Sequence, residues 1–343
     1  MSWRLLIVIP LFLVACAVQP PSVIAPAAKD RGDLLPVFVG TTRAVDRLGR
    51  PSRKTDSAPL SFANHLVAYP QSRETGDVPM ARGVPNPQEK FAVADIKPYT
   101  GEASFARDLK ASLRERPAGK RTVLVYVHGF NVTFSEGLYR TAQIVRDWRI
   151  DHIPAYFSWP STLSPINYAH DQKASLQARQ EFRRFLEAIV DAGAEGIVLL
   201  GHSLGAELVL ETLVAMQTTQ DTRMQQSIDG VFLAAPDMSV DRFTALAGSI
   251  SALPDPFVVF SSSKDWALRL SSLRHGEPER LGALTDPGPL AGLNVLLVDL
   301  SGYREGYVNH RVAFSSPRLL AERDEWTSRS DQVGRALRVL TGE

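Results

Sequence analysis

Residues 197–210 read IVLLGHSLGAELVL, in which a short apolar run meets the pattern G-x-S-x-G and then becomes helical. The four apolar residues 197–200 predict a buried strand. Leu204, Leu208 and Val209 recur at the spacing of one helical face, which predicts a helix directly afterwards. Ser203 is therefore expected in a sharp turn between a strand and a helix.

A turn of this kind predicts that Ser203 is a nucleophile. Side chains two positions before and after it would collide with the neighbouring strand and helix, and Gly201 and Gly205 remove that collision. The turn also presents the serine oxygen at a helix N-terminus, where backbone N–H groups and the helix dipole favour developing negative charge. The pentapeptide also arises by chance in loops, but the flanking strand and helix favour a site for acyl transfer.

These residues resemble the α/β-hydrolase superfamily and, more narrowly, a bacterial family of α/β-hydrolases of unknown function. Three stretches carry the narrower resemblance: VFVGTTR at 37–43, VYVHGFN at 125–131 and AAPD at 234–237. The resemblance extends over roughly residues 34–320. At residues 202–206 the chain has HSLGA, where HSMGN is commoner in that family. The fold that this resemblance implies is a mostly parallel central sheet with helices on both faces.

The N-terminus resembles a bacterial lipoprotein signal. Arg4 precedes the apolar residues 5–15, which are too few to span a bilayer but typical of a signal-peptide core. The run ends in LVAC at residues 13–16, which implies that Cys16 is lipidated and becomes the mature N-terminus. Ala17, rather than an acidic residue, favours the outer membrane. The alternative is an ordinary signal peptide with an incidental cysteine.

The predicted domains are a signal peptide at 1–15, a lipidated tether at 16–33 and one α/β-hydrolase domain at 34–343. The tether contains Pro20, Pro21 and Pro26 and has no periodic apolar pattern. Cys16 is the only cysteine, so no internal disulfide can form. We expect a lipid-anchored protein of the bacterial cell envelope that faces the periplasm from the outer membrane.

Charge and composition limit the partners. The chain has 38 basic and 37 acidic residues, and removal of the signal peptide with Arg4 leaves the two numbers equal. The sequence contains no basic patch that would predict nucleic-acid binding. The expected partners are a small-molecule or lipid ester substrate and, through the lipid anchor, a membrane. The sequence does not define an oligomeric state.

Strand and helix patterns alternate along the rest of the chain, which predicts a mostly parallel sheet with helices on both faces. Residues 70–86 are polar and rich in Gly and Pro, and predict a loop. Strands are predicted at 36–41, 65–68, 122–127, 153–158, 197–200, 230–234, 257–260 and 295–298. Helices are predicted at 104–116, from a cap at Ser135 to 148, at 171–190, and directly after Ser203.

By resemblance, the loop HGFN at 128–131 supplies one oxyanion-hole donor, the Phe130 N–H, and the Leu204 N–H supplies the other. His128, beside that turn, is expected to hold the loop by hydrogen bonds rather than to take part in chemistry. Trp159 and Tyr168 follow a strand's carboxyl end, so they either line a substrate site or pack their loop down.

A serine nucleophile needs a base, and in this fold the order along the chain is Ser, acid, His. Only His275 and His310 lie downstream of Ser203. His310 follows the last predicted strand and is the predicted base, whereas His275 lies in a polar insertion. His202 is excluded because its position in the turn points it away from the serine. No H-E-x-x-H pattern or Cys/His cluster predicts a metal, and no cofactor is expected.

Three aspartates follow strands and are candidates for the acid. If the strand before the nucleophile is counted as the fifth, Asp265 follows the seventh, where α/β-hydrolases most often place the acid. Asp265 is the predicted acid. Asp237 is the second candidate, with an alternative role in capping the helix near Ser239, and Asp299 has only a short loop in which to turn.

These residues predict a serine hydrolase that cleaves a carboxylic ester through an acyl-enzyme. The alternatives with the same site are a thioesterase, an acyltransferase or a peptidase. A non-catalytic envelope binding protein is the alternative from another class, since fold does not imply function.

Overall fold

The computed structural model describes residues 24–343 except 31–32, 53–56, 165, 220 and 277–278. The predicted signal peptide, the predicted lipidation site Cys16 and the first part of the predicted tether lie outside the described residues. Within the described ranges, no helix is long and apolar enough to cross a membrane.

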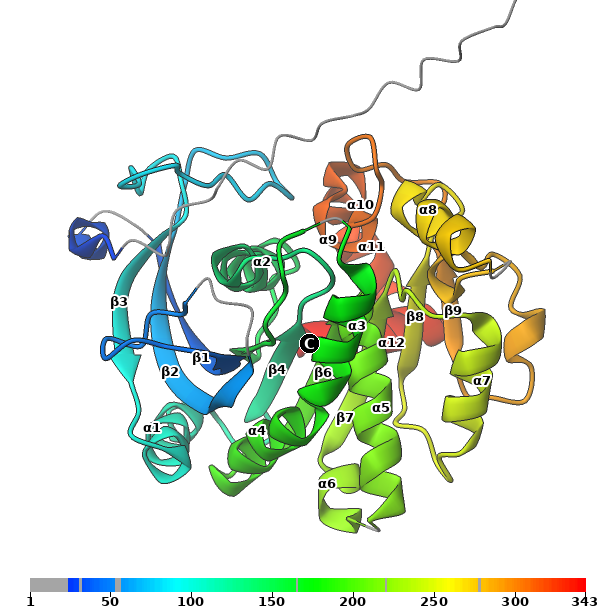
Figure 1. Cartoon of the computed structure of the whole chain (residues 1–343), viewed down its shortest axis with the longest axis horizontal. Coiled ribbons are helices and arrows are strands. Elements are labelled where there is room, and N and C mark those ends of the chain that lie inside the picture. Colours follow the sequence, from blue (N-terminus) through cyan, green and yellow to red (C-terminus); the bar gives the residue numbers. More distant parts are fainter. Residues whose placement is uncertain (1–23, 31–32, 53–56, 165, 220, 277–278) are drawn as a thin grey trace, which may run out of the picture.

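The described residues form one sheet of nine strands in the order β3-β2-β1-β5-β4-β6-β7-β8-β9 (Figure 1). From β1 to β9 in this order all neighbours pair in parallel, whereas β2 and β3 extend the sheet by antiparallel pairing. The bounds are β1 Asp33–Arg43, β2 Ser57–Tyr69, β3 Ala92–Pro98, β4 Thr122–Val127, β5 Ile153–Ser158, β6 Gly196–His202, β7 Ile228–Ala234, β8 Phe257–Ser261 and β9 Leu296–Asp299. This is the predicted α/β-hydrolase fold.

Helices alternate with the parallel strands. The α-helices are α1 Glu102–Arg114, α2 Phe134–Asp147, α3 Tyr168–Gln177, α4 Arg179–Asp191, α5 Leu204–Thr218, α6 Thr222–Gln226, α7 Val240–Gly248, α8 Trp266–His275, α9 Val312–Ser315, α10 Pro317–Ala321, α11 Arg323–Ser328 and α12 Gln332–Thr341. The 3-10 helices are η1 Pro26–Asp30, η2 Leu281–Ala283 and η3 Gly288–Leu290.

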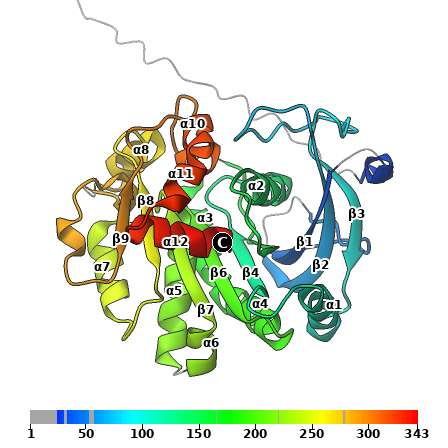
Figure 2. The ribbon, with the colours of Figure 1, turned by 180° about the vertical axis from the view of Figure 1, so that it is seen from behind.

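Two hydrophobic cores cover the two faces of the sheet. In β4, Val123 and Val125 belong to the core that contains α1, α4 and α5, whereas Leu124 and Tyr126 belong to the core that contains α2 and α12. This alternation follows from the two-residue period of a strand. Figures 1 and 2, which view the molecule from opposite sides, show α5 in front of the sheet in one view and α12 in the other. Ser203 follows the carboxyl end of β6, and Asp265 follows the carboxyl end of β8.

Every strand predicted from the sequence is present, but β3 was not predicted. This strand lies at the edge of the sheet, with a buried apolar first half and an exposed charged second half that includes Asp95. The strand that precedes Ser203 is consequently the sixth along the chain rather than the fifth, and Asp265 follows the eighth.

Three further predictions need correction. The cap of α2 is Thr133 and not Ser135, because Thr133 and Glu136 form a capping box. The helix predicted at 171–190 is divided at Ala178 into α3 and α4. Residues 24–30, predicted as tether, pack against β3 through the small side chains of Ala25 and Ala28, so the packed domain extends beyond residue 34 towards the N-terminus.

Candidate active site

Ser203 lies at the turn between β6 and α5, as the sequence predicts, and its backbone is in an unusual conformation. Its φ is 53° and its ψ is −121°, in a region that residues other than glycine rarely adopt. Such a conformation costs on the order of 1–3 kcal/mol and persists only where the surroundings enforce it. The Ser203 N–H donates to the Ala234 carbonyl at 3.0 Å, and the Ala206 N–H donates to the Ser203 carbonyl at 3.0 Å. The strain is therefore held by both neighbouring elements.

The two glycines of the turn are required by close backbone contacts. A Cβ at Gly201 would lie 2.7 Å from the Ala206 Cα. A Cβ at Gly205 would lie 2.4 Å from the Val127 carbonyl oxygen at the end of β4. Both contacts are with backbone atoms, which cannot rotate away. The predicted reason for the glycines, collision with the neighbouring helix and strand, is confirmed.

The loop after β4 lies directly against the turn. A Cβ on Gly129 would come within 2.6 Å of the Ser203 Cβ, so this loop and the serine are in contact. Phe130 is the next residue of the loop, and Leu204 is the first residue of α5, whose N–H has no acceptor within the helix. The predicted oxyanion donors, Phe130 and Leu204, thus come from the two segments that meet at Ser203, and their role stays a prediction.

His128 has a structural setting. It is fully buried and stacks on Trp159 with ring centroids 4.7 Å apart. Its ring nitrogens lie 2.8 Å from the Gly129 carbonyl oxygen and 3.1 Å from that of Trp159. Burial, together with the positive charge of Arg43, lowers the pKa of His128 to about 3, so the ring is neutral. As predicted, His128 holds its loop in place.

The two aromatic residues considered for the substrate site differ little in burial. Trp159 is completely buried and donates from Nε1 to the His128 carbonyl at 3.0 Å, so it packs its loop and does not line an open surface. Tyr168 is also buried, and its ring contacts that of Phe130 edge to face at 5.2 Å. Tyr168 therefore supports the loop that carries Phe130.

The predicted base and acid are in contact. His310 Nδ1 lies 2.7 Å from Asp265 Oδ2, and the Asp265 side chain is 1% exposed. The other carboxylate oxygen, Oδ1, accepts the Leu268 N–H at 3.0 Å and so caps α8. Burial by itself would lower the pKa of His310, but the charge of Asp265 and its hydrogen bond outweigh burial and raise that pKa above 6.5.

The other two aspartates have different partners. Asp237 Oδ1 accepts the Ser271 hydroxyl at 2.8 Å and lies 3.5 Å from Arg280 Nε. Its suggested capping role is wrong, because the hydroxyl of Ser239 caps α7. Asp299 is exposed and accepts the N–H of Ser301 in its own turn at 2.8 Å. His275, the alternative base, is the last residue of α8.

His202 has a function that the sequence did not suggest. Its Nε2 lies 3.1 Å from the His310 carbonyl oxygen, and the two rings are 4.8 Å apart. Burial first, and then the charge of His310, lower the pKa of His202 well below its ordinary value. The neutral ring donates its Nε2–H to that carbonyl. His202 therefore links the segment that carries Ser203 to the segment that carries His310.

The residues after His310 are held by three side chains of α2 and its C-cap, which we call the α2 clamp: Arg140, Gln143 and Trp148. Each bonds a different residue of α9. Arg140 Nη1 donates to the Ser315 hydroxyl at 2.6 Å, Gln143 Nε2 to the Phe314 carbonyl at 2.8 Å, and Trp148 Nε1 to the Ala313 carbonyl at 3.1 Å. The clamp thereby fixes the chain just beyond His310.

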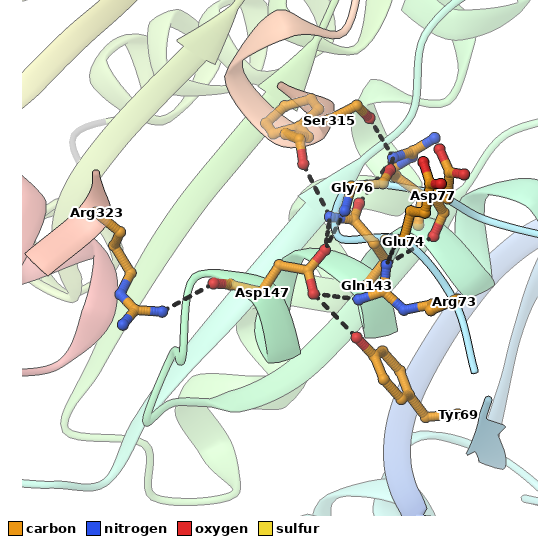
Figure 3. Close-up of polar contacts among 11 residues, drawn as sticks. Tyr69, Arg73, Glu74, Gly76, Asp77, Gln143, Asp147, Ser315 and Arg323 are labelled. Atoms are coloured by element: carbon orange, nitrogen blue, oxygen red, sulfur yellow. Dashed lines mark hydrogen bonds and ion pairs between the residues drawn. The ribbon is translucent and has the colours of Figure 1, made fainter. Parts of the chain in front are cut away.

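Asp147, the last residue of α2, bonds Gln143 of this clamp (Figure 3). Its carboxylate forms a buried ion pair with Arg73 and accepts the Tyr69 hydroxyl at 2.9 Å, the Gly76 N–H at 2.9 Å and Gln143 Nε2 at 2.7 Å. The partners come from the end of β2, from the loop that follows it and from α2. No periodic sequence pattern marks such contacts, so sequence reasoning missed them.

A metal site was not predicted. In the part of the chain that the structure describes, no three or more His, Cys, Asp or Glu side chains are grouped so that they could hold a metal ion.

The strained serine at a strand-to-helix turn and the parallel sheet around it define an α/β-hydrolase. Residues 101–323, more than half of the chain, match the family described as "Alpha/beta hydrolase of unknown function (DUF900)". The chain belongs to this family.

Solved structures with a related fold share little sequence with the chain. A predicted CIB-like hydrolase from Thermoplasma acidophilum is 17% identical, with 61% of this chain and 87% of that chain covered and a TM-score of 0.36. A fungal esterase from Rhizomucor miehei is 13% identical (91% and 94% covered, TM-score 0.40), and lipase B from Aspergillus fumigatus is 13% identical (66% and 57% covered, TM-score 0.40). At these TM-scores the likeness carries no inference about activity. A search of curated proteins found no match.

Proposed function

We propose that the protein is a serine hydrolase that cleaves carboxylic esters through an acyl-enzyme. Ser203 is the nucleophile, His310 the base and Asp265 the acid. The observation that supports this most is the pairing of two features: a strained serine at the start of α5 and an imidazole bonded at 2.7 Å to a buried carboxylate.

In the proposed reaction, His310 Nε2 takes the proton of the Ser203 hydroxyl as its oxygen attacks the ester carbonyl carbon. The developing oxyanion accepts the N–H groups of Phe130 and Leu204. His310 then returns the proton to the departing alcohol, and water releases the acid from the acyl-enzyme by the same steps. Asp265 keeps Nδ1 of the imidazole protonated and stabilises the imidazolium that forms.

The test is hydrolysis of a short dissolved ester such as p-nitrophenyl acetate, together with labelling by a fluorophosphonate. Ser203→Ala and His310→Ala should each lower kcat by roughly 10⁶, because nucleophile and base act as a unit. His170→Ala is the matched control, since the His170 side chain is 58% exposed on α3. Wild-type turnover in the Ser203→Ala protein would overturn the proposal. A wild-type chain that neither hydrolyses esters nor reacts with the probe would favour a non-catalytic binding protein.

A second experiment tests which kind of acyl bond the enzyme cleaves. The same residues could act on a thioester, transfer the acyl group to another acceptor or cleave a peptide. Parallel assays with an oxygen ester, a thioester and an anilide of the same acyl group separate these reactions. We expect the oxygen ester to give the highest kcat/KM.

We also propose that Cys16 is lipidated and holds the enzyme in the cell envelope, at the outer membrane facing the periplasm. The support is the apolar run 5–15 that ends in LVAC at 13–16. More than one acyl chain is needed for stable anchoring, and the lipoprotein modification supplies it. Cys16→Ser should move the protein from the membrane fraction to the soluble fraction or arrest its processing. Normal maturation with full membrane retention would contradict the anchor.

A further inference from the structure

Exposed apolar side chains are concentrated beside the candidate active site. In the described part of the chain nine large apolar residues are exposed. Five of them lie on the segments around Asp265 and His310, and a sixth, Ile166, lies in the loop after β5. We call these six the apolar surface: Ile166 (76% exposed), Trp266 (60%), Leu270 (69%), Leu273 (81%), Tyr307 (100%) and Val308 (49%). Exposed apolar residues scattered singly are ordinary, but a contiguous group marks a binding surface.

Hydrogen bonds connect the three segments that carry these six residues. Trp266, Leu270 and Leu273 are at i, i+4 and i+7 of α8 and so share one face of that helix. The Trp266 N–H donates to the Val308 carbonyl at 3.0 Å, which joins α8 to the segment before His310. The Arg274 side chain donates from Nη2 to the Ile166 carbonyl at 3.4 Å and joins α8 to the loop after β5. The exposed apolar residues are therefore carried by segments that are held together.

The outward face of α8 is more apolar than expected for a helix on a water-exposed surface. Such a helix turns its apolar stripe to the core and its polar side to water. In α8, Leu268 and Ser271 are buried, and Ser271 donates to Asp237, but Trp266, Leu270 and Leu273 are exposed. Packing within the described part of the chain does not cover these three side chains.

Cations lie on α8 and in the loop before it, beside the apolar surface. Lys264, Arg269 and Arg274 are in this stretch, and its carboxylate, Asp265, is buried against His310; Glu277 and Glu279 follow the helix in the sequence. The Arg269 guanidinium lies 5.1 Å from the Trp266 ring centroid. Trp and Leu on one face with Arg and Lys beside them are the composition of helices that lie in the interface of anionic lipids. A second copy of the chain would instead bring two sets of these cations together.

We propose that the apolar surface docks on an anionic lipid layer, with the apolar side chains in the acyl region and Lys264, Arg269 and Arg274 at the headgroups. Figure 1 shows α8 at the periphery of the molecule, where a flat layer can reach it. Docking requires no catalysis. The further statement that the substrates are esters held in that layer rests on the proposed function, because Asp265 and His310 are on the docked segments.

Trp266 reports the docking directly. The experiment uses the full chain with Ser203→Ala, which blocks turnover, and Cys16→Ser, which blocks lipidation. The signal of Trp266 is the difference between the fluorescence of this chain and that of the same chain with Trp266→Phe. Vesicles of phosphatidylcholine with and without phosphatidylglycerol carry brominated acyl chains. We expect a blue shift and quenching of Trp266 with the anionic vesicles, weakened by salt and by omission of phosphatidylglycerol. An unchanged Trp266 signal with anionic vesicles would overturn the proposal.

A surface variant makes the test quantitative. Leu270→Ser with Leu273→Ser should raise the lipid concentration for half-maximal quenching by about tenfold or more, because two apolar side chains no longer leave water. Leu48→Ser is the matched control: Leu48 is 54% exposed in the turn after β1, five strands away from β8 in the sheet. Equal effects of the two changes would contradict a local docking surface.

Two further outcomes separate the interpretations. A Trp266 blue shift without lipid, together with concentration-dependent dimerisation in sedimentation, would assign the apolar surface to a second copy and overturn lipid docking. Hydrolysis of a dissolved ester by the chain with Ser203 intact tests the proposed function alone. Failure of that assay with normal Trp266 quenching would remove the function and leave the docking.

Discussion

The two sides of the candidate site are held in place in different ways. On one side, the turn that carries Ser203 is fixed by backbone contacts with α5, β7 and the end of β4, and these contacts require glycine at 201 and 205. On the other side, His310 lies between β9 and α9, outside any strand or helix. It is held by Asp265 and His202 and, through α9, by the α2 clamp. The nucleophile is therefore held by backbone atoms around a short sequence motif, whereas the base depends on distant side chains.

The sharpest test of this comparison exchanges the two candidate acids. Asp265→Asn should lower kcat by about 10⁴, because an amide cannot hold the imidazole in the required tautomer. An Asn oxygen can still cap α8, so the melting temperature should stay close to that of the wild type. Asp237→Asn is the control at a second buried aspartate. A collapse of activity with Asp237→Asn and near-normal turnover with Asp265→Asn would transfer the acid to Asp237.

The next largest effect is expected far from the chemistry. Asp147→Ala leaves the Arg73 charge buried without its partner, which should lower the free energy of unfolding by about 3–5 kcal/mol. Urea unfolding measures this. Asp191→Ala removes a carboxylate that is 50% exposed in its ion pair with Arg223, and the expected change is within about 1 kcal/mol. If both changes cost the same, the Asp147 network does not hold the base side of the site.

A third prediction concerns the nucleophile side. The Cβ of Gly205→Ala would meet the carbonyl oxygens of Val127 and His128 at 2.4 and 2.5 Å, so β4 and α5 must separate. We expect a loss of about 1–3 kcal/mol of stability, as for overpacking in a core. Gly248→Ala in α7 meets nothing within 4 Å and should be neutral or stabilising. Thermal unfolding of both proteins tests this, and equal melting temperatures would show that the turn can relax.

The smallest predicted effect is a shift of the pH profile. His310 must be neutral to accept the serine proton, and its pKa is raised above 6.5 by Asp265. The kcat/KM for a dissolved ester should therefore rise with pH through a value above 6.5. Residual activity of Asp265→Asn should rise at lower pH, because the cause of the raised pKa is gone. The effect of pH on stability has the opposite sign. The raised pKa of His310 stabilises the folded protein fully below the pKa that His310 has in the unfolded chain. This stabilisation is lost as the pH rises through the pKa of His310 in the folded protein. A rising limb unchanged by Asp265→Asn would remove Asp265 from contact with the base.

The same difference explains how much the sequence could predict. The turn at Ser203 could be predicted because the strand, the glycines and the helix are neighbours in the sequence. β6 and α5 lie where the sequence predicts them. The contact of Asp265 with His310 could also be predicted, because the order of strands brings the ends of β8 and β9 together. The catalytic roles of these residues remain predictions.

What the sequence did not reveal depends on long-range contacts. β3 is an edge strand whose first half is apolar and whose exposed half is charged, so it lacks the alternation that identifies a strand. The α2 clamp joins residues more than 160 positions apart through individual side chains, and no spacing rule identifies such partners. Thr133 was missed as the cap of α2 because Ser135, two residues later, is an equally suitable residue type.

Asp265 limits how the protein can be redesigned. One of its carboxylate oxygens caps the N-terminus of α8, and the other bonds Nδ1 of His310. The first turn of α8 therefore cannot be lengthened, shortened or replaced without moving the imidazole. A library that varies the outward residues Leu270 and Leu273 could change the surface that the enzyme recognises while Asp265 keeps its place.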